Sequence, residues 1–88
     1  MIWKIRLSKD AARQLSRLPQ TQQLLIRERL REMRDDPMRG DVIPLKGRQW
    51  HGWYRKRVGR YRIIFVPHHD THVVEIFAIL LRDEHTYR

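Results

Sequence analysis

Apolar and polar residues alternate at the start of the chain. In "MIWKIRLSKD", Trp3, Ile5 and Leu7 are separated by Lys4 and Arg6. This period of two predicts a strand that turns one face toward a core. We expect the apolar residues to form the inward face.

Two stretches with helical spacing follow this strand. The first, "KDAARQLSRL" at 9–18, comes directly after Ser8, whose hydroxyl suits a helix N-cap, and directly before the helix-breaking Pro19. The second, "QTQQLLIRERLREMRDD" at 20–36, has an apolar stripe on one side and charged residues on the other. The stripe consists of Leu25, Ile26, Leu30 and Met33. Two helices joined through a proline predict a helical hairpin whose apolar sides face a core.

The second half of the chain reads as a loop followed by strands. Residues 36–52 contain prolines and glycines and no sustained period, which predicts a connecting loop. A period of two returns at 53–58 and at 61–67, and Gly59–Arg60 between them suits a tight hairpin turn. The last predicted strand, 72–82, is apolar on both faces, as in a central strand. One of its faces is expected to hold Val73, Phe77, Ile79 and Leu81, and the other Val74, Ile76, Ala78 and Leu80.

Length and element order together predict the fold class. The chain has 88 residues, enough for one modest core, so we expect a single domain over 1–88. The order β-α-α-β-β-β predicts an α+β fold, with a two-helix hairpin packed on a mainly antiparallel twisted sheet. There are no cysteines, which fits a reducing compartment, and no apolar run of membrane-spanning length. The N-terminus does not resemble a signal peptide, so we expect a cytoplasmic protein without membrane contact.

Charge adds the first functional information. Nineteen Lys and Arg against ten Asp and Glu give a formal net charge of +9. Such an excess disfavours the compact state through self-repulsion, so a polyanionic partner is the simplest reason to retain it. Nucleic acid is the leading candidate.

The positive charge is concentrated on the predicted hairpin "WYRKRVGRYRIIF". Strand alternation places Arg55 and Arg57 on one face, and Arg62 and Arg82 are expected to join them. A guanidinium group binds two phosphate oxygens at once through parallel N–H donors, and it stays charged near neutral pH. The RNA-binding residues predicted around these arginines are Lys46, Trp53, Lys56, Arg60 and Tyr61, in which the aromatic rings would stack on bases. The alternative is an ordinary solvated basic face.

The whole pattern resembles the RelE/ParE superfamily of type II toxins, and the RelE branch most. The resemblance rests on the element order, the loop "PLKG", the run Arg-x-Arg-Val-Gly-x-Tyr-Arg from Arg55 to Arg62, and Arg82 and Tyr87 near the end of "LLRDEHTYR". It implies a ribosome-dependent mRNA endonuclease that needs no metal or other cofactor. In that reaction the ribose 2′-OH attacks the adjacent phosphate in the A site. It also implies a hetero-oligomer with a cognate acidic or amphipathic antitoxin, besides contacts with the 70S ribosome and mRNA.

The resemblance assigns roles to individual residues. Arg55 and Arg57 occupy the basic positions of the first hairpin strand, and Arg62 and Arg82 would stabilise the scissile phosphate. Tyr87 matches a C-terminal tyrosine that stacks on the base or assists proton transfer. His85 is a further candidate acid or base, because the pKa of histidine lies near neutral pH. These six residues form the predicted catalytic set.

Other readings stay open at this point. The ParE branch of the superfamily inhibits DNA gyrase and does not cut RNA, and a chain of this fold can also be an inert RNA- or protein-binding module. The "HHDTH" segment at 68–72 suggests a metal site, but neighbouring strand residues point to opposite faces, and no second ligand cluster completes it. We therefore expect a solvated turn and no metal. A membrane-surface helix is disfavoured because acidic residues are mixed with the basic ones in both helices.

Overall fold

The computed structural model describes residues 2–81. Its elements are β1 (Lys4–Leu7), α1 (Lys9–Ser16), α2 (Gln20–Glu32), β2 (Val42–Pro44), a short 3₁₀ helix (Arg48–Trp50), β3 (Tyr54–Val58), β4 (Tyr61–His68) and β5 (Val73–Leu81). The sheet order is β1-β5-β4-β3-β2. β1 pairs with β5 in parallel, and the other neighbours are antiparallel. The predicted α+β fold with a helical hairpin on a mainly antiparallel sheet is confirmed.

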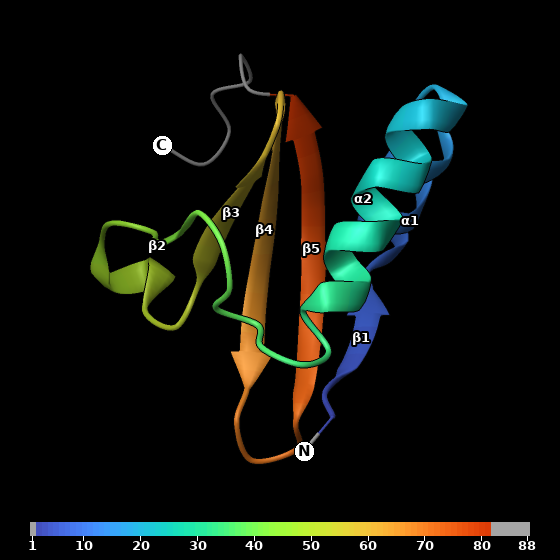
Figure 1. The fold of residues 1–88 in the computed structure, drawn as a ribbon. Helices are drawn as coiled ribbons and strands as arrows, with labels where there is room; N and C mark the ends of the chain where they lie inside the picture. The colour runs from blue at the N-terminus through green and yellow to red at the C-terminus, as the bar shows by residue number, and fades with distance from the viewer. Residues whose placement is uncertain (1, 82–88) are drawn as a thin grey trace.

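The two helices lie on one side of the sheet, near β1 and β5, and the chain after α2 crosses to β2 at the opposite edge (Figure 1). Their buried residues join those of the sheet in one main core. Ile26, Leu30 and Met33 of the predicted stripe are buried in it, while Leu25 is partly buried and packs against it. The second helix ends at Glu32, earlier than the predicted 36. Beyond it the backbone N–H groups of residues 33–35 donate to the carbonyls three residues earlier, so the chain continues in tighter turns, and Pro37 disfavours helical geometry at Asp36.

β2 is a strand where the sequence pattern predicts a loop. It has only three residues, ends in a proline and carries no readable alternation, so its pairing with β3 defines it as a strand. Hydrogen bonds extend this pairing on both sides: Arg57 N–H donates to Asp41 O at 2.9 Å, and Leu45 N–H donates to Trp53 O at 3.0 Å. A short edge strand with proline also discourages pairing with other chains.

A β-bulge in β5 alters the predicted faces of the last strand. Ile64 pairs with Ala78 but its neighbour Phe65 pairs with Ile76, which leaves Phe77 as the extra residue. Strict alternation is therefore broken, and the predicted assignment of faces is wrong beyond this point. Ile79 shares the helix-covered core with Val74 and Ile76, whereas Ala78 and Leu80 belong to a second cluster on the other face.

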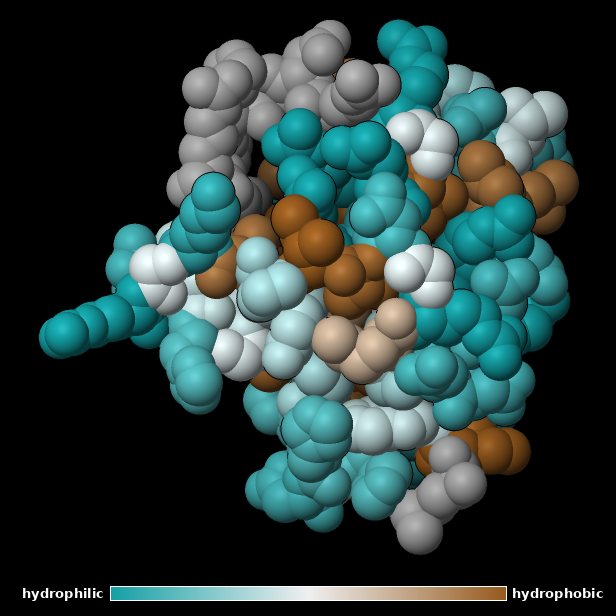
Figure 2. Space-filling model, turned by 60° about the vertical axis from the view of Figure 1, so that its left-hand side comes forward, coloured by the Kyte–Doolittle hydropathy of each residue, from teal (hydrophilic) through white to brown (hydrophobic). Residues whose placement is uncertain are grey.

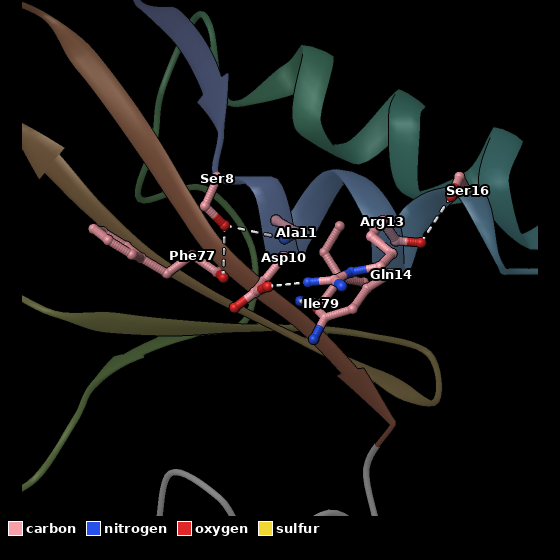
Figure 3. Close-up of polar contacts among 8 residues, drawn as sticks. All are labelled: Ser8, Asp10, Ala11, Arg13, Gln14, Ser16, Phe77 and Ile79. Atoms are coloured by element: carbon pink, nitrogen blue, oxygen red, sulfur yellow. Dashed lines mark hydrogen bonds and ion pairs between the residues drawn. The ribbon is translucent and has the colours of Figure 1, made fainter.

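The N-cap residue of α1 and a glutamine within the helix hold the bulge in place (Figure 3). Ser8 Oγ accepts a hydrogen bond from Ala11 N–H at 3.0 Å, which confirms the predicted N-cap, and donates one to Phe77 O at 2.9 Å. Gln14 Oε1 accepts from Ile79 N–H at 2.7 Å. β1 pairs with β5 only as far as Ile76, so these side chains satisfy backbone groups that the strand ladder leaves free.

Ser8→Ala should therefore lower the free energy of unfolding by about 1 to 2 kcal/mol, because it removes a cap and a contact with the bulge. Ser16→Ala is the matched control, since Ser16 Oγ makes only an exposed bond to Arg13 O near the end of the same helix. Urea unfolding of both variants measures the difference. Equal stabilities would contradict a role of Ser8 in holding the bulge.

Candidate nucleic-acid interface

Arg55, Arg57 and Arg62 lie together on the sheet face opposite the helices, a surface that we call the arginine face. The register pairs Arg57 directly with Arg62, and Arg55 with Ile64. Alternate residues of a strand share a face, so all three arginines lie on the side of Ile64, whose cluster with Ala78 contains no helix residue. The predicted convergence of these three arginines is present in the structure.

The arginine face contains donors that are poorly satisfied. The Nε atoms of Arg55 and Arg62 are buried and have no hydrogen-bond partner within residues 2–81. Buried donors nearly always have a partner, so an unpaired one favours an incoming acceptor. Burial first, and then the charges of Arg62 and Arg57, lower the pKa of Arg55. An anion that docks here would relieve both the repulsion and the unpaired donors.

The face also has an acidic neighbour, Asp41, which is not among the predicted site residues. Asp41 Oδ2 lies 3.8 Å from Arg57 Nε, and Asp41 opposes the lowering of the Arg55 pKa. The residue precedes β2, a strand that cannot be recognised from alternation, so its position beside Arg57 was not predictable. The sequence feature that marks this position is a carboxylate directly before the short apolar pair Val42–Ile43, and it does not indicate the strand partner.

Lys56 and Tyr61 do not join the arginine face, which corrects their placement in the predicted RNA-binding set. Lys56 is 3% exposed on the helix-covered side, where its Nζ donates to Arg39 O at 2.6 Å. Tyr61 is 6% exposed and belongs to the main core with Ile63. Neither side chain is accessible to a nucleic acid in this conformation, because strand alternation turns both toward the helices.

The remaining predicted RNA-binding residues are accessible to different extents. Lys46 and Arg60 are exposed, in the loop after β2 and in the tight turn after β3. Trp53 is half-buried and stacks with the ring of Phe77 at 4.3 Å and edge-on with that of Trp50 at 5.2 Å. It therefore helps to pack the second core cluster, and only part of its ring faces solvent. Figure 2 turns the β2 side of the sheet forward and shows hydrophilic residues around a short exposed hydrophobic strip.

Three of the six predicted catalytic residues, Arg82, His85 and Tyr87, lie outside the described residues. β5 ends at Leu81, so its pairing with Tyr61 brings the chain to the end of the sheet that also carries the Gly59–Arg60 turn. Arg62 directly follows Tyr61 on β4. The described part of the chain thus ends at the same end of the sheet as the Gly59–Arg60 turn.

The histidines of the β4–β5 turn have contacts of their own. His68 Nε2 lies 3.0 Å from Glu75 Oε1, and the rings of His69 and His72 pack against Trp3 with centroids 5.3 and 4.8 Å away. Residues 2–81 contain no group of three or more His, Cys, Asp or Glu side chains arranged to hold a metal ion. In the same range, neither helix has the length and apolar character needed to cross a bilayer.

Solved structures with the same architecture are toxins and toxin–antitoxin complexes. The RelE–RelB complex from the archaeon Pyrococcus horikoshii matches with a TM-score of 0.81 at 25% identity, over 97% of this chain and 100% of that one. The RelBE2 toxin–antitoxin complex from Mycobacterium tuberculosis matches with a TM-score of 0.82 at 23% identity, over 93% and 100%. A YoeB/ParE toxin from Agrobacterium tumefaciens matches with a TM-score of 0.75 at 17% identity, over 89% and 96%.

The matching family model and the similar solved structures identify a toxin of the RelE/ParE superfamily, as the sequence pattern predicted. The family model described as the ParE toxin of the type II toxin–antitoxin system parDE matches residues 5–85. The chain belongs to this family of type II toxins. A search of curated proteins found no significant match.

Proposed function

We propose that this toxin is an endoribonuclease that cuts mRNA in the ribosomal A site without a metal cofactor, and so stops translation in the cytoplasm. The arginine face carries the proposal: Arg57 and Arg62 are direct cross-strand partners, and Arg62 and Arg55 each keep a buried Nε without a partner in residues 2–81. A phosphate bound there would receive paired guanidinium donors. A solvated basic face would not need to bury such donors.

The proposed chemistry is transfer of the phosphate within the RNA. The ribose 2′ oxygen forms a bond to phosphorus while the bond from phosphorus to the 5′ oxygen breaks, which leaves a 2′,3′-cyclic phosphate and a 5′-OH. Arg62, with Arg57 and Arg55, would stabilise the charge that builds on the phosphate oxygens. Arg82 is proposed for the same role. Arginine does not accept protons near neutral pH, so proton transfer is proposed for His85 and Tyr87, the latter also stacking on the base.

The direct test is incubation of the protein with 70S ribosomes programmed with mRNA and an empty A site, followed by mapping of the new 5′ ends. We expect cuts within the A-site codon that disappear without ribosomes. The match to a ParE toxin model supports a second candidate, inhibition of DNA gyrase. A supercoiling assay with the same preparation distinguishes the two. Gyrase inhibition with intact mRNA would replace the nuclease proposal, and inactivity in both assays would favour a binding module.

The partner proposed for this toxin is an acidic, amphipathic antitoxin in a hetero-oligomer. The Pyrococcus relative was solved as a RelE–RelB complex, and the Mycobacterium relative as a toxin–antitoxin complex. A groove of about 230 Å³ between β1 and the helices suits such a segment because its floor is apolar and its rim is basic. It is lined by Ile5, Leu7, Leu15, Leu30, Arg27, Arg31 and Arg34. The floor would bury apolar antitoxin side chains, and the three arginines would pair with its carboxylates.

Arg27→Glu should weaken antitoxin binding by about tenfold or more, because it places a like charge against an acidic segment. Lys9→Glu is the control: it makes the same change of charge at an exposed residue at the start of α1 that does not line the groove. Isothermal titration with the antitoxin encoded beside the toxin gene measures both affinities. Equal weakening in the two variants would indicate a general charge effect and place the antitoxin elsewhere.

A further inference from the structure

Asp41 is attached to the arginine face in a way that leaves the donors of Arg57 available. Its backbone carbonyl accepts from Arg57 N–H at 2.9 Å, and its Oδ2 lies 3.8 Å from Arg57 Nε. The second distance exceeds that of a hydrogen bond, so the carboxylate attracts the guanidinium without occupying its N–H groups. Both side chains are accessible, 55% for Asp41 and 42% for Arg57. An incoming phosphate can therefore reach Arg57 while Asp41 is in place.

The segment before Asp41 is held by Lys56, which lies on the opposite face of β3 from Arg57. Lys56 Nζ donates to Arg39 O at 2.6 Å. Gly40 has φ +89°, and a Cβ on it would lie 2.8 Å from Lys56 Nζ, so a side chain there would be strained and would collide with the ammonium group. Arg39 O and Asp41 O thus anchor the chain on both sides of Gly40. Asp41 has little backbone freedom to lose when its carboxylate faces Arg57.

We propose that Asp41 is a built-in competitor of the RNA phosphate for Arg57, which sets the affinity of the arginine face for RNA. The inference rests on the proposed function in taking an RNA phosphate as the ligand. In the free protein Asp41 reduces the repulsion among Arg55, Arg57 and Arg62. On binding, the phosphate shares the attraction of Arg57 with the carboxylate, which then lies near a second negative charge. Asp41 therefore weakens binding of RNA and limits the retention of non-substrate polyanions.

The test measures the affinity of Asp41→Asn for a 2′-O-methylated single-stranded RNA, which cannot be cut, by fluorescence anisotropy between about 50 and 200 mM salt. We expect binding about twofold to fivefold tighter than that of the unmodified chain, the range of exposed ion pairs. The slope of log affinity against log salt should steepen by up to about one, because Arg57 then holds more counterions to release. Asp70→Asn is the matched control, with the same charge change in the exposed β4–β5 turn at the other end of the sheet.

A double mutant separates the proposed pair from general charge. In an Arg57→Ala background, Asp41→Asn should have a clearly smaller effect, because the nearest partner of the carboxylate is gone and only its weaker attraction to Arg55 is left. Unchanged or weaker binding by Asp41→Asn, or equal tightening by Asp70→Asn, would overturn the inference. Loss of ribosomal cleavage in Asp41→Asn at unchanged RNA affinity would overturn it too, in favour of a proton-accepting role. The predicted binding pattern in a protein that cuts no mRNA would sustain the inference while removing the nuclease proposal.

Discussion

Arg62→Ala is expected to lower single-turnover cleavage of mRNA on programmed ribosomes by about 10²- to 10³-fold and to abolish toxicity, while the domain remains folded. Arg62 is half-buried, pairs across strands with Arg57 and has an Nε without a partner in the described residues. Its donors are thus oriented before the substrate arrives. Their removal takes away stabilisation of the negative charge that develops on the phosphate in the transition state. Arg82→Ala is expected to give the same loss on the basis of the family resemblance.

Arg17→Ala is the control for this prediction, since it removes one positive charge from an exposed position at the end of α1. It should leave the cleavage rate within about twofold. In activation free energy this is well below the roughly 1.4 kcal/mol that corresponds to a tenfold change in rate. Thermal unfolding and matched expression establish that all variants are folded. Full toxicity of Arg62→Ala at equal expression would remove this residue from the catalytic set, and with it the main support for the nuclease proposal.

Lys56→Ala is expected to lower the free energy of unfolding by about 2 to 4 kcal/mol, although it removes a charge from a strongly basic chain. The change leaves a cavity beneath the helices and an unpaired Arg39 carbonyl in the segment that leads to β2. Lys46→Ala removes the same side chain from an exposed loop position and should change stability by less than about 0.5 kcal/mol. Urea unfolding near neutral pH measures both, and equal effects would contradict a structural role of Lys56.

Lys56→Met tests the electrostatic part of this contact, because it restores much of the volume without the charge. Burial is the main cause that lowers the pKa of Lys56 in the folded protein, and Glu32 opposes it. Between that lowered pKa and the ordinary lysine value, the unfolded chain binds more protons than the folded one, so this group makes stability rise with pH in that interval. The rise should be smaller in Lys56→Met. Identical pH profiles would show that the ammonium group is not desolvated.

Alternation alone placed Arg55 and Arg57 on one face and Lys56 on the other, and the Gly59 turn brought Arg62 opposite Arg57. The prediction that cations and aromatic rings near the arginines bind RNA nevertheless includes Lys56 and Tyr61, because composition does not record which face of a strand the helices cover. Asp41 was missed for a related reason, since its neighbour Arg57 is distant along the chain.

The sequence by itself determined the elements whose information is local: the two helices with their apolar stripes, the Ser8 cap, the β3–β4 hairpin and the excess of positive charge. These follow from periodicity, capping and turn chemistry within a few residues. Only the tertiary structure decided the strand β2, the bulge at Phe77, the buried bond of Lys56 and the position of Asp41 beside Arg57. Each depends on groups far apart in sequence, so it exists only once the sheet has formed and the helices have covered one of its faces.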